Sequence, residues 1–173
     1  MIFNVDKRRK QQLRAAEGYL SLGMPDQALD VLTRLSDPGE SAFDCHMLRG
    51  DALRAKLDHH QALDSFRQAH TLDPNSLDAL MGMAWCFKRI DRVDQSIETM
   101  RRAYLIHPTV PVVLYNLACY HSLAGHKEQA LSWLGRALRM NRGIGKLIPA
   151  ETDFDPLRGD PEFRHLLELS AEG

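Results

Sequence analysis

The stretch from residue 43 to residue 76 decides the fold, and it reads FDCHMLRGDALRAKLDHHQALDSFRQAHTLDPNS. Its order of small and large side chains returns every 34 positions, so that the chain divides into four similar repeats. Self-similarity at a fixed period of this length is the signature of a solenoid, in which one small structural element is stacked several times. The period therefore takes precedence over any local propensity in predicting the fold.

Five columns of residues recur in register over the four repeats. Two columns hold small residues, one is aliphatic, one is large and apolar, and the last is mostly Ala. The columns are Ala16, Gly50, Ala84, Ala118; Ala28, Ala62, Ser96, Ala130; Leu29, Leu63, Ile97, Leu131; Leu32, Phe66, Met100, Leu134; and Leu35, Ala69, Ala103, Ala137. Small side chains let two helices approach closely, while the larger ones above and below fill the gaps. A single helix pair buries too little apolar surface to fold alone, so neighbouring repeats must stack.

Each repeat is predicted to be two short helices joined by a tight turn. In the fourth repeat, residues 112–124 and 127–139 carry apolar side chains at helical spacing, and Gly125 breaks the pattern between them. Pro74 and Pro108, also 34 positions apart, end the second helices of two repeats, because proline disfavours helical geometry in the residue before it.

The first repeat follows the same plan but ends early. Gly23 occupies the breaker position, and Pro25 suits the first turn of the helix that follows. The sequence Asp37-Pro38-Gly39 arrives before the expected stop and predicts a shortened second helix.

These residues, above all Gly50, Ala62, Phe66, Ala69 and Pro74, resemble the tetratricopeptide repeat family. The resemblance covers about residues 9–142 and implies an all-α fold, a right-handed superhelix of four helix-turn-helix repeats with C-terminal capping helices. It places the repeats at about 9–42, 43–76, 77–110 and 111–144, and a cap at 145–173, within one domain over 1–173. The departures are His46 for Trp, Arg49 for Leu and Ser96 for Ala.

The period fails after Arg142, as expected for a terminal cap. Residues 143–150 predict one short helix. Asp160 is a good N-cap and Pro161 a good first residue for a second helix that runs to about Leu169, with Phe163 facing inward. This tail is similar to one that closes bacterial tetratricopeptide proteins, which implies a bacterial source.

The resemblance also implies that the first helices of successive repeats line a groove that binds a peptide. The side chains projected onto this groove are Met47, Asp51, Arg54, Met81, Trp85, Lys88, Arg89, Tyr115, Asn116 and Cys119, with Lys10, Leu13 and Glu17 from the first repeat. Trp and Tyr are typical anchors of binding energy, and Met surfaces re-pack around varied apolar partners. The alternative for Met47, Met81 and Tyr115 is packing between neighbouring helices.

Composition and motifs exclude other classes of function. A net charge of −1 and a pI near 6.7 provide no field that attracts nucleic acid or an anionic membrane. Cys45, Cys86 and Cys119 match no metal or disulfide spacing and indicate reduced thiols in a cytoplasmic protein. No catalytic or cofactor-binding motif appears. We therefore expect no cofactor and no metal, and we assign Asp153 and its neighbours to caps and turns.

Three functions from different classes are compatible with the sequence to different degrees. The best supported is a scaffold or adaptor whose groove binds a peptide or amphipathic helix of a partner protein. The alternative is a dedicated chaperone that shields an apolar segment of a client. An enzyme with a site outside the repeats is least supported, because only the short segment after the fourth repeat is left for it. Assembly with a second copy of the chain is also open.

Overall fold

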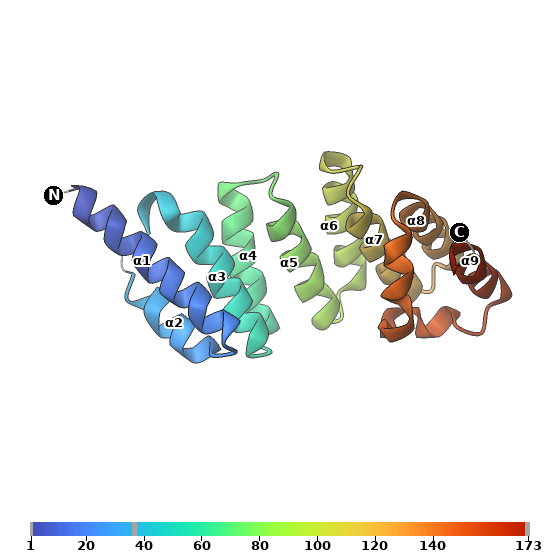
Figure 1. Ribbon diagram of the computed structural model, residues 1–173, viewed down its shortest axis with the longest axis horizontal. Coiled ribbons are helices and arrows are strands. Elements are labelled where there is room, and N and C mark those ends of the chain that lie inside the picture. Colours follow the sequence, from blue (N-terminus) through green and yellow to red (C-terminus); the bar gives the residue numbers. More distant parts are fainter. Residues whose placement is uncertain (1, 36–37, 172–173) are drawn as a thin grey trace. The chain divides into compact units, whose positions relative to one another are not determined.

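The computed structural model describes residues 2–35 and 38–171, with side chains from 6–35 and 38–169, and this part of the chain consists of helices and turns (Figure 1). It forms two compact units, residues 1–90 and residues 91–173. The single domain stays a prediction, and each unit is described by itself. Within the described ranges, every helix is too short or too polar to cross a membrane.

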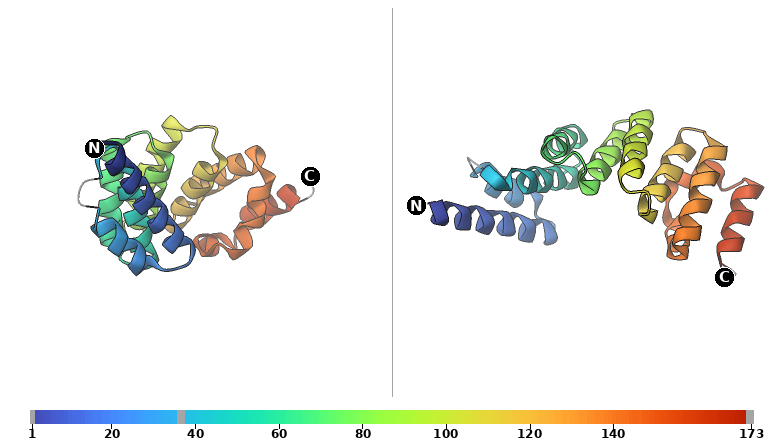
Figure 2. Two further views of the ribbon diagram at one scale, coloured as in Figure 1. Left: turned by 60° about the vertical axis from the view of Figure 1, so that its left-hand side comes forward. Right: turned by 90° about the horizontal axis from the view of Figure 1, so that it is seen from above.

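Unit 1, residues 1–90, is a stack of helices in which each helix runs antiparallel to the next one in the chain (Figure 2). Its helices are α1 (Ile2–Ser21), α2 (Pro25–Thr33), the short 3-10 helix η1 (Gly39–Ser41), α3 (Ala42–Ala55), α4 (His59–Leu72) and α5 (Leu77–Arg89). Consecutive α-helices pack against each other, and α3 also contacts both α1 and α5. The odd-numbered helices therefore adjoin one another, as the first helices of successive repeats should.

Unit 2, residues 91–173, begins with the same kind of helix pairs and ends in a different way. Its elements are α6 (Val93–Ile106), α7 (Pro111–Leu123), α8 (Lys127–Met140), the 3-10 helices η2 (Arg142–Lys146), η3 (Ile148–Ala150) and η4 (Thr152–Leu157), and α9 (Pro161–Ala171). The η4 segment packs on α7, while α9 packs on α8 and η2.

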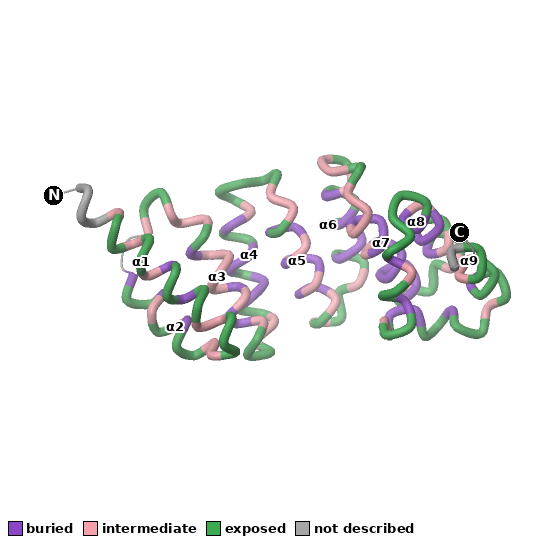
Figure 3. Tube along the Cα trace, in the orientation of Figure 1, coloured by how far each residue is buried: buried purple, intermediate pink, exposed green. Residues whose placement is uncertain are grey.

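Buried positions recur along the helices of both units (Figure 3), and they include four of the five repeating columns, as predicted, whereas Leu29 and Leu131 of the aliphatic column are half-buried. All four members of each small-residue column are buried, and so are all members of the large apolar column. Phe66 shows why two positions must stay small: a Cβ atom on Gly50 would lie 2.6 Å from its ring, and one on Gly82 would lie 2.8 Å from it. The ring of Phe66 therefore fills the space between α3 and α5 that these two glycines leave.

The turn after each first helix has the same backbone geometry in all four repeats. Gly23, Leu57, Asp91 and Gly125 are 34 positions apart, and each has a positive φ between 60° and 74°. This left-handed conformation closes the turn, and it disfavours residues with a Cβ atom. Leu57 and Asp91 therefore carry a local strain that Gly23 and Gly125 avoid.

Several predicted helix ends are confirmed. Pro25 begins α2, and the helices before Pro74 and Pro108 end at Leu72 and Ile106. The second helix of the first repeat is short, nine residues against 14 for α4. Asp37 of the predicted stop lies outside the described residues.

The C-terminal prediction is confirmed in one part and wrong in another. Asp160 caps α9 as predicted, accepting hydrogen bonds from the backbone N–H of Glu162 at 2.9 Å and of Phe163 at 3.3 Å. Residues 143–150 do not form one short helix. They lie in the two 3-10 helices η2 and η3 and are followed by η4, because Pro149 and Pro156 interrupt regular hydrogen bonding.

Candidate functional site

An open groove lies along the odd-numbered helices of unit 1. It has a volume of about 710 Å³. Its lining consists of Glu17, Leu20 and Ser21 from α1, Leu48, Asp51, Arg54 and Ala55 from α3, Leu57 from the following turn, and Trp85 from α5. This mixture of apolar surface and a few charged groups is typical of a binding cleft.

The lining follows directly from the repeat. Glu17, Asp51 and Trp85 occupy the same position in three successive repeats. Arg54 and Ala55 lie three and four positions after Asp51, so all three project from one face of α3. The same face of each first helix therefore points into the groove, and its chemistry changes from one repeat to the next.

Trp85 is the dominant side chain of this groove. The guanidinium carbon of Arg89 lies 4.9 Å from the centre of its ring, and that of Arg54 lies 5.4 Å from it. The imidazole of His59 meets the indole edge-on at 5.2 Å. Cation–π and edge-to-face contacts of this kind hold an aromatic ring in one orientation. The half-buried indole is therefore pre-positioned rather than free to rotate.

The charges beside Trp85 are partly paired. Arg54 donates to the Asp51 carboxylate at 2.9 Å, across one turn of α3. Burial raises the pKa of Asp51, the Arg54 guanidinium opposes that shift, and the nearby Asp78 carboxylate adds to it. Arg54 is already paired with Asp51. The exposed Arg89 is therefore the positive charge next to the indole that is more available to a partner.

Only some of the groove residues predicted in unit 1 lie in the groove. Asp51, Arg54 and Trp85 line the groove together, and Arg89 lies against the indole. Met47 instead packs against the core cluster that contains Phe66.

Met81 and Lys88 are half-buried and lie outside the lining. Leu20, Leu48 and Leu57 were not predicted as groove residues. The repeat register indicates Leu20, which stands one period before Arg54, whereas Leu48 and Leu57 depend on how the helices pack.

The predicted residues of unit 2 lie in a different environment. Tyr115 and Cys119 are 5% and 2% exposed, beneath the C-terminal segment rather than on an open wall. The ring of Tyr115 contacts the fully buried Phe154 of η4, with 5.7 Å between ring centres. Asn116 is half-buried. Burial raises the pKa of Tyr115, and the neighbouring Cys119 thiol and Glu151 carboxylate raise it further.

A signal for this burial was present in the sequence. The α7 segment, PVVLYNLACYHSL, is apolar on nearly all sides, and a helix of this kind is covered on all sides. The groove prediction treated Tyr115 and Cys119 as binding residues because of their position in the repeat. The covering segment η4 belongs to a later part of the chain, beyond the whole of α8.

Two groupings of polar side chains were not predicted from the sequence. His121, which is buried, places its Nδ1 atom 3.2 Å from Nδ1 of His126. His59 and His60 are the first two residues of α4.

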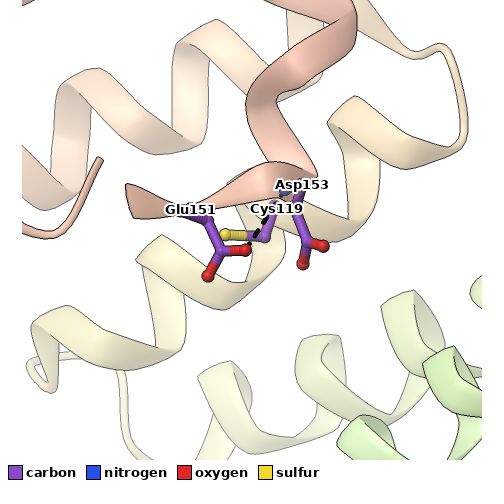
Figure 4. Close-up of side chains that lie close together, drawn as sticks. All are labelled: Cys119, Glu151 and Asp153. Carbon is purple, nitrogen blue, oxygen red and sulfur yellow. Dashed lines mark hydrogen bonds between the residues drawn. The ribbon is translucent and has the colours of Figure 1, made fainter. Parts of the chain in front are cut away.

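The second grouping consists of Cys119, Glu151 and Asp153, whose possible ligand atoms all lie within 4.8 Å of one another (Figure 4). Two other acidic residues of the tail form ion pairs, which were not predicted: Asp155 pairs with Arg158 at 2.7 Å, and Asp160, the predicted cap, pairs with Lys127 at 2.7 Å. All three cysteines are buried thiols.

The comparisons with known proteins agree with the repeat. Residues 78–109 match the family model described as tetratricopeptide repeat. No curated protein matches the chain.

Solved structures of similar fold include PilF of Pseudomonas aeruginosa, at 21% identity and a TM-score of 0.76 over 98% of this chain and 78% of that one. They also include MamA from Desulfovibrio magneticus RS-1, at 17% identity and a TM-score of 0.72 over 95% of this chain and 96% of that one. A third is a tetratricopeptide protein of Thermus thermophilus, TTC0263, at 15% identity and a TM-score of 0.67 over 95% of this chain and 97% of that one.

At these identities the structural likenesses show the fold, and they confirm the predicted all-α class. The match over residues 78–109 shows that the chain carries a tetratricopeptide repeat, and the register of small and large side chains and the fold repeat the same architecture in the rest of the helix pairs.

Proposed function

We propose that this protein is a non-catalytic scaffold or adaptor that binds a short segment of a partner protein in the groove of unit 1. The observation that carries the proposal is Trp85, a half-buried indole at an open groove, whose ring is contacted by the guanidinium groups of Arg54 and Arg89. Tetratricopeptide repeats are in general modules for protein interaction. The groove of unit 1 is where this chain offers an accessible aromatic anchor.

The chemistry of the lining suggests the kind of segment that fits. Leu20, Leu48 and Leu57 supply apolar surface beside the indole, which favours an apolar side chain as the anchor of the partner. The exposed Arg89 favours an acidic residue next to that anchor. A volume of about 710 Å³ accommodates a few side chains, as a peptide or one face of an amphipathic helix presents them.

Pre-organisation supports an anchor role for Trp85 rather than a purely structural one. A ring that is already held by two cations and by His59 loses little rotamer entropy when a ligand covers it. The indole also packs against the core cluster of unit 1. Because Trp85 is half-buried and lines the groove, part of the indole remains accessible to a partner.

The proposal is tested by capture and binding with two matched variants. Trp85→Ala removes the indole of the groove, whereas Trp133→Ala removes an indole of unit 2 that packs edge-on against Tyr104 at 5.0 Å. Proteins from the source organism that bind the parent chain and Trp133→Ala, but not Trp85→Ala, are the specific partners. Titration calorimetry with the responsible peptide should then show that Trp85→Ala weakens binding by more than ~1 kcal/mol.

The experiment also has an outcome that contradicts the proposal. If Trp85→Ala is folded by circular dichroism and binds the captured partner with the affinity of the parent chain, the binding site lies elsewhere.

The chaperone alternative is less supported by the arrangement of side chains. It relied on a groove rich in methionine, but Met47 packs against the core cluster and Met81 lies outside the lining. The two functions differ in the state of the partner. An adaptor binds the native partner, while a chaperone binds its client before folding or export.

We further propose that the protein acts in the cytoplasm. Its three cysteines are buried thiols, and burial raises the pKa of Cys86 to about 11, which keeps that thiol protonated and unreactive. A reducing compartment is where such thiols are ordinarily found.

A further inference from the structure

Three possible metal ligands converge where the C-terminal segment crosses α7. Cys119 comes from the middle of α7, while Glu151 and Asp153 flank the start of η4 (Figure 4). Cys119 is 2% exposed, Asp153 is 6% exposed, and Glu151 is half-buried. The three donor atoms lie within 4.8 Å of one another. Two segments of the chain, separated by the whole of α8, are needed to assemble this set.

The donor set has a chemical preference. A thiolate together with carboxylates is a combination that Zn²⁺ accepts, whereas Mg²⁺ and Ca²⁺ prefer oxygen ligands alone. Ligand atoms around one zinc ion lie ~3.3 to 3.8 Å apart, given Zn–S of about 2.3 Å and Zn–O of about 2.0 to 2.2 Å. Side-chain rotations that bring the three donor atoms about an ångström closer together are therefore enough for them to bind one zinc ion.

A bound cation reduces the electrostatic cost of placing the Glu151 and Asp153 carboxylates close together. Two carboxylates brought together at a largely buried position repel each other and lose hydration, a cost that positive charge and hydrogen bonds reduce. A backbone hydrogen bond from the N–H of Asp153 to Oε1 of Glu151, at 3.2 Å, compensates part of this cost. A divalent ion among the three donors supplies two positive charges at the point where the negative groups meet.

We propose that Cys119, Glu151 and Asp153 form a zinc-binding site that fastens the C-terminal segment to α7. The protein supplies three ligands, and a water molecule takes the fourth position. Tyr115 hydrogen-bonds with Cys119 and belongs to the outer shell that orients a ligand of this kind. The site lies in unit 2 and does not depend on the peptide groove of unit 1.

The test uses Co²⁺ as a spectroscopic substitute for Zn²⁺ on the full chain, after treatment with a chelator and a thiol reductant. We expect one equivalent of Co²⁺ to produce a thiolate-to-cobalt charge-transfer band, and one equivalent of Zn²⁺ to remove it. Cys119→Ala should abolish the band. The matched control is Cys86→Ala, since Cys86 is also buried but lies outside the cluster.

Two further variants keep the test decisive if Cys119→Ala fails to fold. Glu151→Gln alters the most exposed ligand and should weaken Zn²⁺ binding at least tenfold, as should Asp153→Asn. In parallel, Zn²⁺ should raise the Tm of the parent chain and of Cys86→Ala, because an ion that binds the folded state stabilises it.

Several results would overturn the proposal. They are the absence of a charge-transfer band in the parent chain, a band that persists in folded Cys119→Ala, or unchanged Zn²⁺ affinity in both carboxylate variants. Trp85→Ala should bind Co²⁺ as the parent chain does, so failure of the zinc site and failure of the peptide groove can be told apart.

Discussion

The same repeat position has opposite environments in the two units of this protein. In unit 1, Glu17, Asp51 and Trp85 line an open groove. In unit 2, Cys119 is the next residue in that series, 34 positions after Trp85, and it is buried under the C-terminal segment. The repeat therefore determines which direction a side chain points, but not whether that direction leads to solvent.

The covering segment explains the difference. Ile148, Phe154 and Leu157 are buried, and η4 packs directly on α7. A solenoid must end somewhere, and its last repeat has no following repeat to complete its core. Here the tail folds back over the inner helix of the last repeat. As a result, the face of α7 that corresponds to the groove side of the helices in unit 1 is buried.

The largest expected effect is the loss of stability when the C-terminal segment that covers α7 is disrupted. Phe154 is fully buried, and its ring lies 5.6 Å from that of Phe163 as well as close to Tyr115. Phe154→Ala should cost ~3 to 5 kcal/mol of unfolding free energy, the usual range for emptying a buried aromatic site. Urea unfolding measures this loss. In the folded variant, Cys119 should also react faster with a thiol reagent.

The control for this prediction is Leu147→Ala, in the same segment. Leu147 is 52% exposed, so its removal should change stability by less than ~0.5 kcal/mol. Equal effects of the two substitutions would mean that Phe154 does not hold the cover in place.

A smaller effect concerns pH and the burial of His121. Burial, together with the nearby Arg101 guanidinium and His126, lowers the pKa of His121 to about 4. Its ordinary value is 6.5, so between about pH 6.5 and about pH 4 the unfolded chain binds more protons than the folded one. The contribution of His121 to stability should therefore be constant above this window and fall by ~1 to 3 kcal/mol as the pH decreases through it.

Denaturant midpoints of the parent chain and of His121→Gln across this pH range measure the contribution. The variant retains every carboxylate, so only the slope due to His121 should disappear. Parallel pH profiles for the two proteins would show that the imidazole is not the group responsible.

The smallest expected effect compares equivalent turns of the two units. Leu57 has a φ of 64° and is 73% exposed, while Gly125 occupies the same position two repeats later. Leu57→Gly should raise stability by ~0.5 to 1 kcal/mol by relieving left-handed strain, and Gly125→Leu should lower it by ~1 to 2 kcal/mol. Because Leu57 also lines the groove, its substitution should weaken peptide binding while it strengthens the fold.

Thermal unfolding and peptide titration of both variants separate these two contributions. A Leu57→Gly protein that melts below the parent chain would indicate that the leucine gains more from its contacts than it loses to strain.

Much of the fold was predictable because its main rule is local and repeated. The burial of Ala28, Ala62 and Ala130 follows from their position in a column, whatever surrounds the molecule. Proline and Asp160 mark helix ends through their own backbone chemistry. Gly82 was missed, because its need for a small side chain arises from the ring of Phe66 on another helix.

The candidate groove was predictable in part. Asp51, Arg54 and Trp85 share a helical face and a repeat register, both of which the sequence displays. Tyr115 and Cys119 satisfied the same criteria, yet they lie beneath η4. The contact of Cys119 with Glu151 and Asp153 joins residues without any common spacing.

The sequence by itself determined the helices, their turns and the core columns, because helix periodicity and side-chain volume act over short distances along the chain and recur every 34 positions. Only the tertiary structure decided which inner faces are open and which are covered. That outcome depends on where an irregular tail docks, and docking is governed by the sum of many contacts between distant segments rather than by any local pattern.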